Sequence, residues 1–522
     1  MSAANATTPE TKAVVEPPSV VMRGAALAGA VFVLALANFM AVLDMTIVNV
    51  AVPHIASGLA VSSHEGTWVI TSYAVAEAIM VPLSGWLANR FGAVRVFCTS
   101  AVLFALASAL CGFSQSIQML VAFRILQGLT GGPLMPMSQI LLMRISPPKR
   151  QNLTIGLWTM TTILAPICGP LVGGHIADSV GWPWAFYINV PIGIVCAIFA
   201  WNLLSVRETP IRKMRVDFIG LALLIVWVGA MQMMLDNGET HDWFASPLIV
   251  SFAVIAVIGF VLFVIWELGE EHPIVDLRIF RYPAFSIACA AMGITFGCYF
   301  ASIVLVPLWL QLNMGYTATL AGEIMAFNGA LALFMAPIAA MLMSRLDPRL
   351  MMSYGLSVLA VCTLLRAGFA QNMTFEQIAF VQMLVGLGMP FFFVPLTSVS
   401  MQTVKPHEVP AAAGMLGFVR TSAVAFATAI VTTAWQNGGT RNKVDMVETL
   451  NDPAAAIEQL TSTGMSYEQA RATLDSMVQS QSVMVATNEL FFVIGLIIVV
   501  TAAAIWLMPK PKGPLQRPTG GH

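Results

Sequence analysis

Several charged residues lie inside long apolar stretches of the sequence. Asp44, Glu77 and Glu323 are acids, and Arg124 and Arg420 are bases. Ionised groups are costly in such stretches, so they face the interior of a helix bundle or a water-filled cavity, and they often mark ion or proton pathways. The chemistry that these residues offer is the pairing of opposite charges and the loading and release of protons.

Asp44 and Arg124 are predicted to lie at the same depth, roughly 10–12 Å from one membrane face, on antiparallel helices. They can then form either a static ion pair that holds two helices together or a titrating, substrate-sensing pair. Glu77 is either a neutral, hydrogen-bonded core acid or a proton carrier. Glu323, a turn or so from the outer face, is predicted to carry protons, and Arg420 is a further charge partner within a span.

The composition of the chain predicts that these residues are carried by membrane-spanning helices. Of 522 residues, 58% are hydrophobic and 10% are charged, against roughly 45–50% and 25% in soluble domains. The net charge of -1 excludes a strongly basic nucleic-acid binder. The chain is therefore predicted to be an all-α polytopic membrane protein, since a helix of roughly 20 apolar residues crosses the bilayer core. Fourteen spans are predicted, at residues 24–52, 66–88, 94–113, 117–143, 152–176, 182–204, 216–235, 247–267, 284–312, 318–343, 350–370, 375–401, 410–436 and 489–508.

The distribution of cations predicts the orientation. Most of the 25 Lys and Arg residues fall on the side of the N-terminus, whereas Arg441, Lys443 and Arg471 fall on the other side. Cytoplasmic loops are enriched in Lys and Arg, so both termini are predicted to be cytoplasmic. The polar segments 1–22 and 510–522 are then cytoplasmic tails, the first of them disordered.

Two connections between spans are unusual. Segment 205–215 is a basic cytoplasmic linker, and segment 437–488 is a long polar stretch on the far side. Within the latter, Ser466 and Gln469 have the spacing of a capping box, which predicts a helix over 467–488.

No signature of an enzyme is present. The sequence lacks a CxxC pair, an HExxH helix, a phosphate-binding loop and a GxSxG elbow. We therefore expect no catalytic residue, no metal and no cofactor, and an energy source outside the chain.

The fifth predicted span combines small residues with prolines. Its glycines offer a flat face for close helix contact, and its prolines remove backbone hydrogen-bond donors. Common structural packing alone would account for the pattern. The residues concerned are Gly156, Pro166, Gly169, Pro170, Gly173 and Gly174.

Four further motifs accompany this span in order: LDMTIVNVAVP (43–53), GWLANRFGAVR (85–95), RILQGLTGG (124–132) and WPWAFYINVPIG (182–193). In these motifs the chain resembles the major facilitator superfamily, specifically its fourteen-span drug:proton antiporters of the EmrB/QacA type. Asn89 stands where the family motif usually has Asp, which weakens the expectation of a charge latch there. Ala165 replaces a glycine of the fullest fifth-span pattern, a change that preserves packing.

The resemblance implies a 6 + 2 + 6 arrangement of fourteen helices. Residues 23–204 and 269–509 would form two six-helix bundles, and residues 205–268 would contain the linker and two inserted helices. The halves would rock around a central cavity that opens to each side in turn. Wall residues of this cavity are predicted to include Asn38, Phe327, Asn328, Phe391, Phe392 and Phe393.

The resemblance also implies a function: proton-driven efflux of small hydrophobic drugs across a bacterial inner membrane. The partners would be a periplasmic membrane-fusion adaptor (EmrA-like) and a TolC-like outer-membrane channel. Segment 437–488 would either dock the adaptor or gate the cavity. An exporter of an endogenous siderophore, fatty acid or lipid would have the same sequence features, and a non-transporting receptor or enzyme is the alternative of a different class.

Overall fold

The computed structural model describes residues 21–148, 150–211, 216–343, 345–405, 407–449 and 453–509, and throughout this part the regular elements are helices. Inside a bilayer a helix satisfies all its backbone hydrogen bonds within one segment, which is why the apolar runs fold this way. The α-helices of the first half are α1 (Gly24–Gly58), α2 (Ser63–Phe91), α3 (Ala93–Gly112), α4 (Ile117–Gly131), α5 (Leu134–Ile145), α6 (Gln151–Ser179), α7 (Trp184–Tyr187) and α8 (Asn189–Leu204). They are followed by α9 (Phe218–Gly238), α10 (Pro247–Gly269), α11 (Pro283–Leu312), α12 (Ala318–Leu342), α13 (Pro348–Arg366), α14 (Phe375–Thr403), α15 (Val409–Thr449), α16 (Pro453–Ser462) and α17 (Tyr467–Ala504).

Twelve helices in the described part are long and apolar enough to cross a membrane, and each overlaps a predicted span. The predicted spans 117–143 and 152–176 are helical but are not among the twelve. The first is divided into α4 and α5 around Gly132 and Pro133, and the second, α6, contains many Thr and Gly residues. The all-α membrane fold is confirmed, while the count of fourteen stays a prediction.

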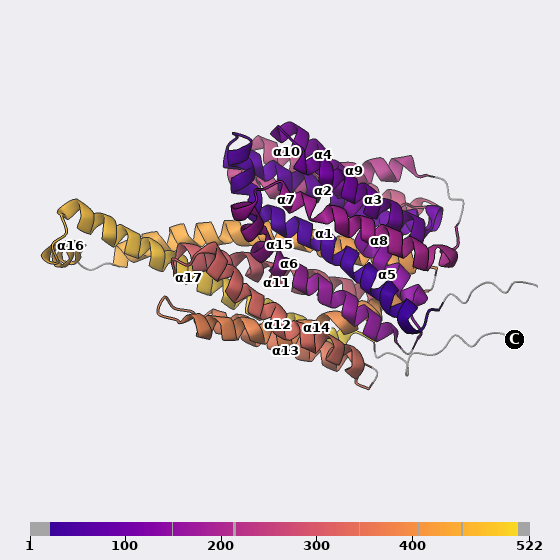
Figure 1. Cartoon of the computed structure of the whole chain (residues 1–522). Coiled ribbons are helices and arrows are strands. Elements are labelled where there is room, and N and C mark those ends of the chain that lie inside the picture. The colour runs from indigo at the N-terminus through magenta and orange to yellow at the C-terminus, as the bar shows by residue number, and fades with distance from the viewer. Residues whose placement is uncertain are drawn as a thin grey trace, which may run out of the picture.

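The helices form two halves with a pair of helices beside them (Figure 1). Helices α1–α8 pack mainly with one another, as do α11–α15 with α17. The halves meet where α6 packs on α12 and where α2 packs on α15. Helices α9 and α10 pair with each other, and α9 also contacts both α2 and α15. The inserted pair therefore lies against both halves.

Glycines allow the closest helix contacts. A Cβ atom on Gly169 of α6 would lie 2.1 Å from Thr46 Oγ1 of α1, and one on Gly173 would lie 3.0 Å from the Ile47 carbonyl oxygen. On the other side of α6, a Cβ on Gly156 would lie 2.8 Å from the Ala340 Cβ atom of α12. Helix α6 thus packs closely on both halves. Pro166 is buried in this helix, and the side-chain positions of Pro170 and Gly174 lie outside the described residues.

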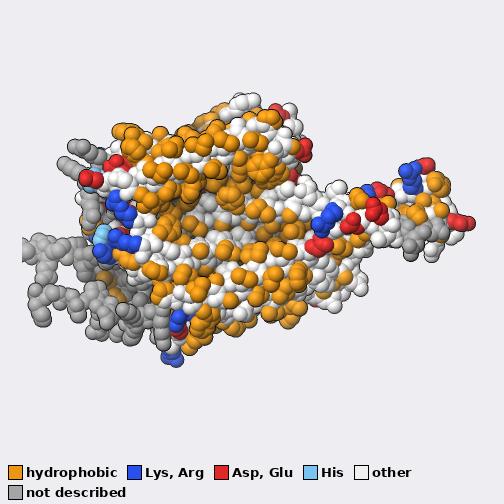
Figure 2. Space-filling model, turned by 180° about the vertical axis from the view of Figure 1, so that it is seen from behind, with side chains coloured by type: hydrophobic (Ala, Val, Ile, Leu, Met, Phe, Trp, Pro, Cys, Tyr) orange, Lys and Arg blue, Asp and Glu red, His pale blue; other side chains and the backbone are white. Residues whose placement is uncertain are grey.

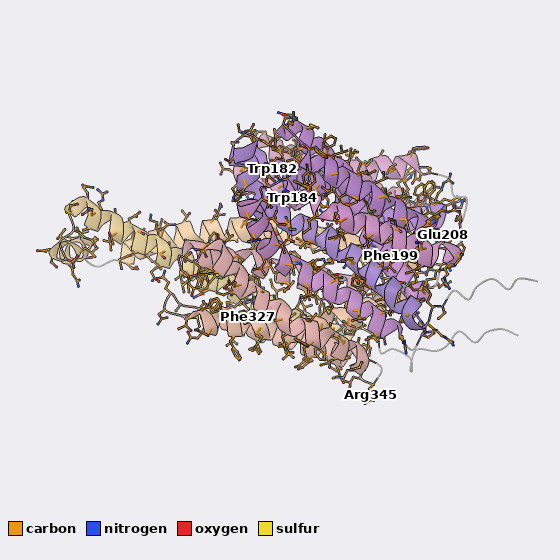
Figure 3. All side chains as sticks on the ribbon, in the orientation of Figure 1. Trp182, Trp184, Phe199, Glu208, Phe327 and Arg345 are labelled. Carbon is orange, nitrogen blue, oxygen red and sulfur yellow. The ribbon has the colours of Figure 1, made fainter. Side chains whose placement is uncertain are left out.

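A broad apolar belt surrounds the bundle. In Figure 2, hydrophobic side chains cover the middle of the visible face, and Lys and Arg side chains gather mainly at one end of the bundle and along the projecting arm. Glu208 and Arg345 lie at the end away from the arm, whereas Trp182 and Trp184 lie toward the arm (Figure 3). Charged ends and tryptophans at the edge of an apolar belt are typical of a bundle that spans a bilayer.

Segment 437–488 is a helical arm rather than a loop with one helix (Figure 1). Helix α15 has 41 residues and is about 60 Å long, so it continues from the bundle into the arm. The predicted capping box is confirmed: Ser466 accepts a hydrogen bond from Gln469 N and begins α17, which runs through the arm into the last span. The Lys443–Asp475 ion pair, at 2.9 Å, joins α15 to α17.

Candidate transport site

Asp44 and Arg124 form a fully buried ion pair, as their depth predicts. Arg124 Nη1 lies 2.7 Å from Asp44 Oδ2, and the two side chains are 1% and 0% exposed. The second carboxylate oxygen, Oδ1, accepts hydrogen bonds from Gln127 at 2.9 Å and from Asn189 at 2.7 Å. Three donors from α4 and α8 therefore hold one carboxylate of α1.

The network continues beyond this pair. Gln127 Nε2 and Asn189 Nδ2 each donate to Ser108 Oγ of α3 at 3.1 Å. Arg124 Nε donates to the Val69 carbonyl oxygen at 3.0 Å, and its guanidinium lies 4.1 Å from the centre of the Tyr73 ring. These contacts favour the interpretation of a static pair that joins helices, and a titrating role for Asp44 stays a prediction.

A cavity lies between the two halves. Its empty space, part of which is open to the outside, is about 500 Å³, and it is lined by residues of α5, α6, α11, α14 and α15. Most of the residues that line it are apolar, including several methionines and aromatic residues, and a few are polar. The methionine and aromatic wall residues are Met135, Trp158, Met292, Phe296, Tyr299, Met389 and Phe393, and the polar ones include Gln139, Thr159, Thr162, Thr397 and Arg420.

Arg420 is the charged residue among those that line this cavity, and Glu77 is its electrostatic partner. Arg420 lines it, and its guanidinium lies 5.4 Å from the centre of the Phe296 ring and contacts Met135 Sδ. Glu77 of α2 interacts electrostatically with Arg420. The Glu77 side chain is 8% exposed, and its Oε2 atom has no hydrogen-bond partner among the described residues. In contrast to Asp44, Glu77 therefore has a carboxyl oxygen free to carry a proton.

Gly128 of α4 and Gly132, which directly follows this helix, bring Glu77 to this position. A Cβ on Gly128 would lie 2.5 Å from the Tyr73 carbonyl oxygen, and one on Gly132 would lie 2.8 Å from the Met80 Cβ atom. Because α4 has no side chains at these points, α2 can pack directly on it. The RILQGLTGG motif therefore supplies both Arg124 and the surface that positions Glu77.

The other predicted wall residues take different positions. Phe393 lies on the cavity wall. Asn328 is buried beside the cavity and donates to the Tyr299 hydroxyl at 3.2 Å, and Asn38 donates to Thr161 and Thr162 of α6. Their roles toward a substrate stay predictions.

Three phenylalanines lie outside the cavity lining. Phe391 packs against Tyr354, and Phe392 is fully buried between helices. Phe327 is 38% exposed on α12 (Figure 3). Glu323, also on α12, is exposed as well, one turn from Phe327. The structure does not bring Glu323 into the Asp44 network, and its role as a proton carrier stays a prediction.

The halves also touch at the end of the bundle away from the arm. Asn152 Oδ1 accepts hydrogen bonds from Ser398 at 2.8 Å and from Gln402 at 3.3 Å, which links α6 to α14. A Cβ on Gly85 would lie 2.9 Å from the Ala411 Cα atom, so α2 and α15 are in backbone contact. These contacts hold the two halves together on one side of the cavity.

Sequence reasoning missed Gln127, Asn189 and Ser108, because uncharged polar residues are common in membrane helices. One signal was available for Gln127: it follows Arg124 by three residues, so both side chains lie on the same face of a helix. Nothing comparable links Asn189 or Ser108 to Asp44 in the sequence.

Comparison with known proteins identifies the family. The model of the Major Facilitator Superfamily matches residues 34–428. The Multidrug export protein EmrB of Escherichia coli (strain K12) is 39% identical over 506 residues, covering 96% of this chain and 99% of EmrB. The Fatty acid resistance protein FarB of Neisseria gonorrhoeae is 38% identical over 505 residues, covering 96% of this chain and 99% of FarB.

A solved structure supports the fold. The human organic anion transporter MFSD10 superimposes with a TM-score of 0.56 at 13% identity, covering 90% of this chain and 99% of the transporter. At this identity the likeness concerns the fold alone. The chain is a multi-pass membrane transporter that belongs to the Major Facilitator Superfamily and, within it, to the EmrB-like proteins.

Proposed function

We propose that the protein is a proton-driven exporter of hydrophobic and amphipathic compounds that works by alternating access of the central cavity. The observation that carries this proposal is the cavity between the two halves, with methionine and aromatic residues and an arginine in its wall, and with a carboxyl group that interacts with this arginine. Flexible methionines and aromatic rings accommodate ligands of different shapes, which suits an exporter of many compounds.

The name of the E. coli relative, a multidrug export protein, supports the same function. The twelve apolar helices are consistent with residence in the bacterial inner membrane. We assign both termini to the cytoplasm because the cations gather at the end of the bundle away from the arm (Figure 2).

Glu77 is our candidate for the proton carrier. When Glu77 is ionised, its negative charge compensates the positive charge of Arg420. When Glu77 is protonated, the Arg420 side chain can attract a substrate or change its position. Proton binding and substrate binding would then shift the same equilibrium between two conformations, which is the condition for coupling. Asp44 is less suited to this task, because three donors hold its carboxylate.

Transport in everted membrane vesicles tests the proposed function. Vesicles that contain the protein should accumulate hydrophobic dyes when respiration acidifies their lumen, and a protonophore should abolish the accumulation. Vesicles from cells without the gene are the control. Accumulation that persists with the protonophore would contradict proton coupling, and no accumulation of any dye would contradict multidrug export.

Export of an endogenous or environmental fatty acid is the second candidate. It is favoured by the name of the gonococcal relative, a fatty acid resistance protein. Arg420 in the cavity wall would also suit an anionic substrate better than a cationic one. The same vesicles distinguish the two functions, since a dedicated fatty acid exporter would transport labelled fatty acid but no neutral or cationic dye.

The arm is our candidate for the surface that meets a periplasmic adaptor, through which substrate would reach an outer-membrane channel. It projects from the bundle (Figure 1), and it exposes apolar side chains, among them Val444 and Val447, each 53% exposed, and Met477, 56% exposed. Apolar side chains on a projection outside the lipid belt are typical of an interaction surface. Gating of the cavity is the alternative role of this segment.

Shortening the arm separates the two roles. Residues 445–476 would be replaced by a short Gly/Ser turn, which retains the Arg441–Glu489 ion pair near the base of the arm, at 3.2 Å. We expect this variant to transport dye in vesicles without adaptor, to lose drug resistance in cells and to lose co-purification with the adaptor. Loss of vesicle transport would assign the arm to the gate, and unchanged resistance would show that the arm is dispensable.

A further inference from the structure

The C-terminal half contains a fully buried arginine, Arg366, at the end of α13. Its side chain is 3% exposed. Its Nη2 atom donates to Gln382 Oε1 of α14 at 2.6 Å, and its guanidinium lies 5.9 Å from the centre of the Phe491 ring. A guanidinium keeps its charge at all physiological pH values, so burial does not neutralise Arg366.

No described carboxylate compensates this charge. Arg124 has Asp44 at 2.7 Å, and Arg420 has Glu77 as an electrostatic partner. The titratable groups that interact with Arg366 are the Cys362 thiol and the Tyr299 hydroxyl, which are both neutral at physiological pH. A buried charge without a counter-charge is strongly unfavourable, so the compensating group is expected to come from outside the chain.

Arg366 lines a second, smaller cavity between α11, α13, α14 and α17. Several hydrogen-bond donors at this cavity have no partner among the described residues. Arg366 Nε and the hydroxyl of Thr295 line the cavity. Nε2 of Gln382 lies beside it, and the orientation of this amide is fixed because its oxygen accepts from Arg366. Thr295 and Gln382 are both completely buried. Unsatisfied donors around an uncompensated cation match an anion with several acceptor atoms.

The residues that line the cavity indicate which kind of anion it would bind. Leu359, Val385 and Ile498 form an apolar part of its wall, and Tyr299 belongs to both this cavity and the central one. A ligand with an apolar tail could therefore place its charged head beside Arg366. Arg366 is also buried too deeply to meet the head group of a surrounding lipid.

We propose that this second cavity is a binding site for amphipathic monocarboxylates, in which Arg366 and its neighbouring donors hold the carboxylate. The inference rests on the proposed function for the route by which the ligand arrives, from the central cavity past Tyr299. It adds a substrate class and a second subsite to that function.

Binding to the purified full-length protein tests the site. Octanoate, octanol and octylammonium share the same tail and differ in the head, and sodium chloride tests a small inorganic anion. Thermal unfolding reports binding, because a ligand of the native state raises the unfolding temperature. Octanoate should stabilise the wild type more than octanol or octylammonium does.

Arg366→Gln removes the charge and keeps a polar side chain. It should weaken octanoate binding about tenfold or more, with little effect on octanol, and Arg366→Lys should retain part of the preference. Arg441→Gln, the same change at an arginine that is 67% exposed on the arm, is the matched control and should bind octanoate as the wild type does. Equal octanoate binding by Arg366→Gln and the wild type would overturn the proposal. Stabilisation by chloride but not by octanoate would also overturn it.

A structural role for Arg366 gives a different pattern. Without ligand, Arg366→Gln should unfold at the wild-type temperature or above it, because it removes an uncompensated buried charge; a large drop that octanoate does not change would contradict the proposal. If this variant does not fold, Thr295→Val removes another unpartnered donor at nearly constant volume and should still weaken octanoate binding.

Dye transport separates this inference from the proposed function. Arg366→Gln should still export a cationic dye in energised vesicles, because the central cavity is intact. We expect that this variant no longer binds octanoate in preference to octanol and that it still exports the dye. Absence of dye export by the wild type would contradict the proposed function and leave the binding result unaffected.

Discussion

At the scale of residues, three arginines inside the bundle, two of them fully buried, differ in how the chain compensates their charge. Arg124 pairs with Asp44 at 2.7 Å, Arg420 interacts electrostatically with Glu77, whose Oε2 atom has no described hydrogen-bond partner, and Arg366 has no described acid. The first arrangement joins helices, the second is suited to a change of protonation, and the third is suited to a ligand. The same residue type thus serves three purposes in one bundle.

The Asp44–Arg124 pair predicts a compensating double variant. Asp44→Asn leaves Arg124 as an uncompensated buried charge, and Arg124→Gln does the same to Asp44. Each single variant should lower the free energy of unfolding by about 3–5 kcal/mol, and the double variant should lose less than the sum. Thermal unfolding in detergent measures all three. Strictly additive losses would show that the two charges do not stabilise each other.

Glu408 predicts a pH-dependent contribution to stability. It lies between α14 and α15 and accepts hydrogen bonds from the Tyr282 hydroxyl at 2.9 Å and from Lys405 N at 3.1 Å, and it pairs with Arg281. Burial raises the pKa of Glu408, but these hydrogen bonds and the Arg281 charge outweigh it, so the pKa lies below its usual value of 4.5.

The ionised form of Glu408 therefore stabilises the fold above pH 4.5, and this contribution disappears as pH falls through the lowered pKa. Glu408→Gln should unfold at a lower temperature than the wild type at neutral pH. The difference should shrink in acid, where the wild-type carboxyl also becomes neutral. A difference that stays constant with pH would contradict this account.

At the scale of elements, helix α6 connects the two halves, and its glycines determine how closely it packs. Gly169→Ala should destabilise the protein by about 1–3 kcal/mol and reduce transport, because the new Cβ would lie 2.1 Å from Thr46 Oγ1. Gly229→Ala in α9 is the matched control, since a Cβ there meets nothing within 4 Å. Thermal unfolding and vesicle transport check both variants, and equal behaviour of the two would contradict the packing argument.

Most elements could be predicted from the sequence, because apolar runs of a fixed minimum length leave few alternatives in a bilayer. The predicted start of α11 at residue 284, for example, is one residue from its observed start at Pro283. The arm was predicted less well: α15 and α17 continue without a break from apolar into polar sequence. Polarity shows where the membrane ends but not where a helix ends.

The site was partly predictable for a related reason. Charged residues in apolar runs stand out, so Asp44, Glu77, Arg124 and Arg420 could all be selected. Which of them pair depends on tertiary packing, and the cavity wall depends on how five helices converge. A phenylalanine such as Phe392 has the same sequence pattern as Phe393, although only the latter lines the central cavity.

At the scale of the whole molecule, coupling requires that one charge change affects how the halves contact each other. Glu77 lies on α2 of the first half, and Arg420 lies on α15 of the second. Their interaction crosses the interface between the halves, and Arg420 lines the cavity. A proton on Glu77 would therefore weaken a contact between the two halves beside the central cavity.

Transport by purified protein in proteoliposomes tests this claim most directly. With an acidic lumen, the wild type should accumulate a hydrophobic dye in the lumen while protons leave. Glu77→Gln should lose this accumulation but still exchange labelled for unlabelled dye across the membrane, because the cavity is intact and only the proton carrier is missing. Glu458→Gln, the same change at an exposed acid of the arm, should behave as the wild type does. Proton-driven accumulation by Glu77→Gln at the wild-type level would contradict the account.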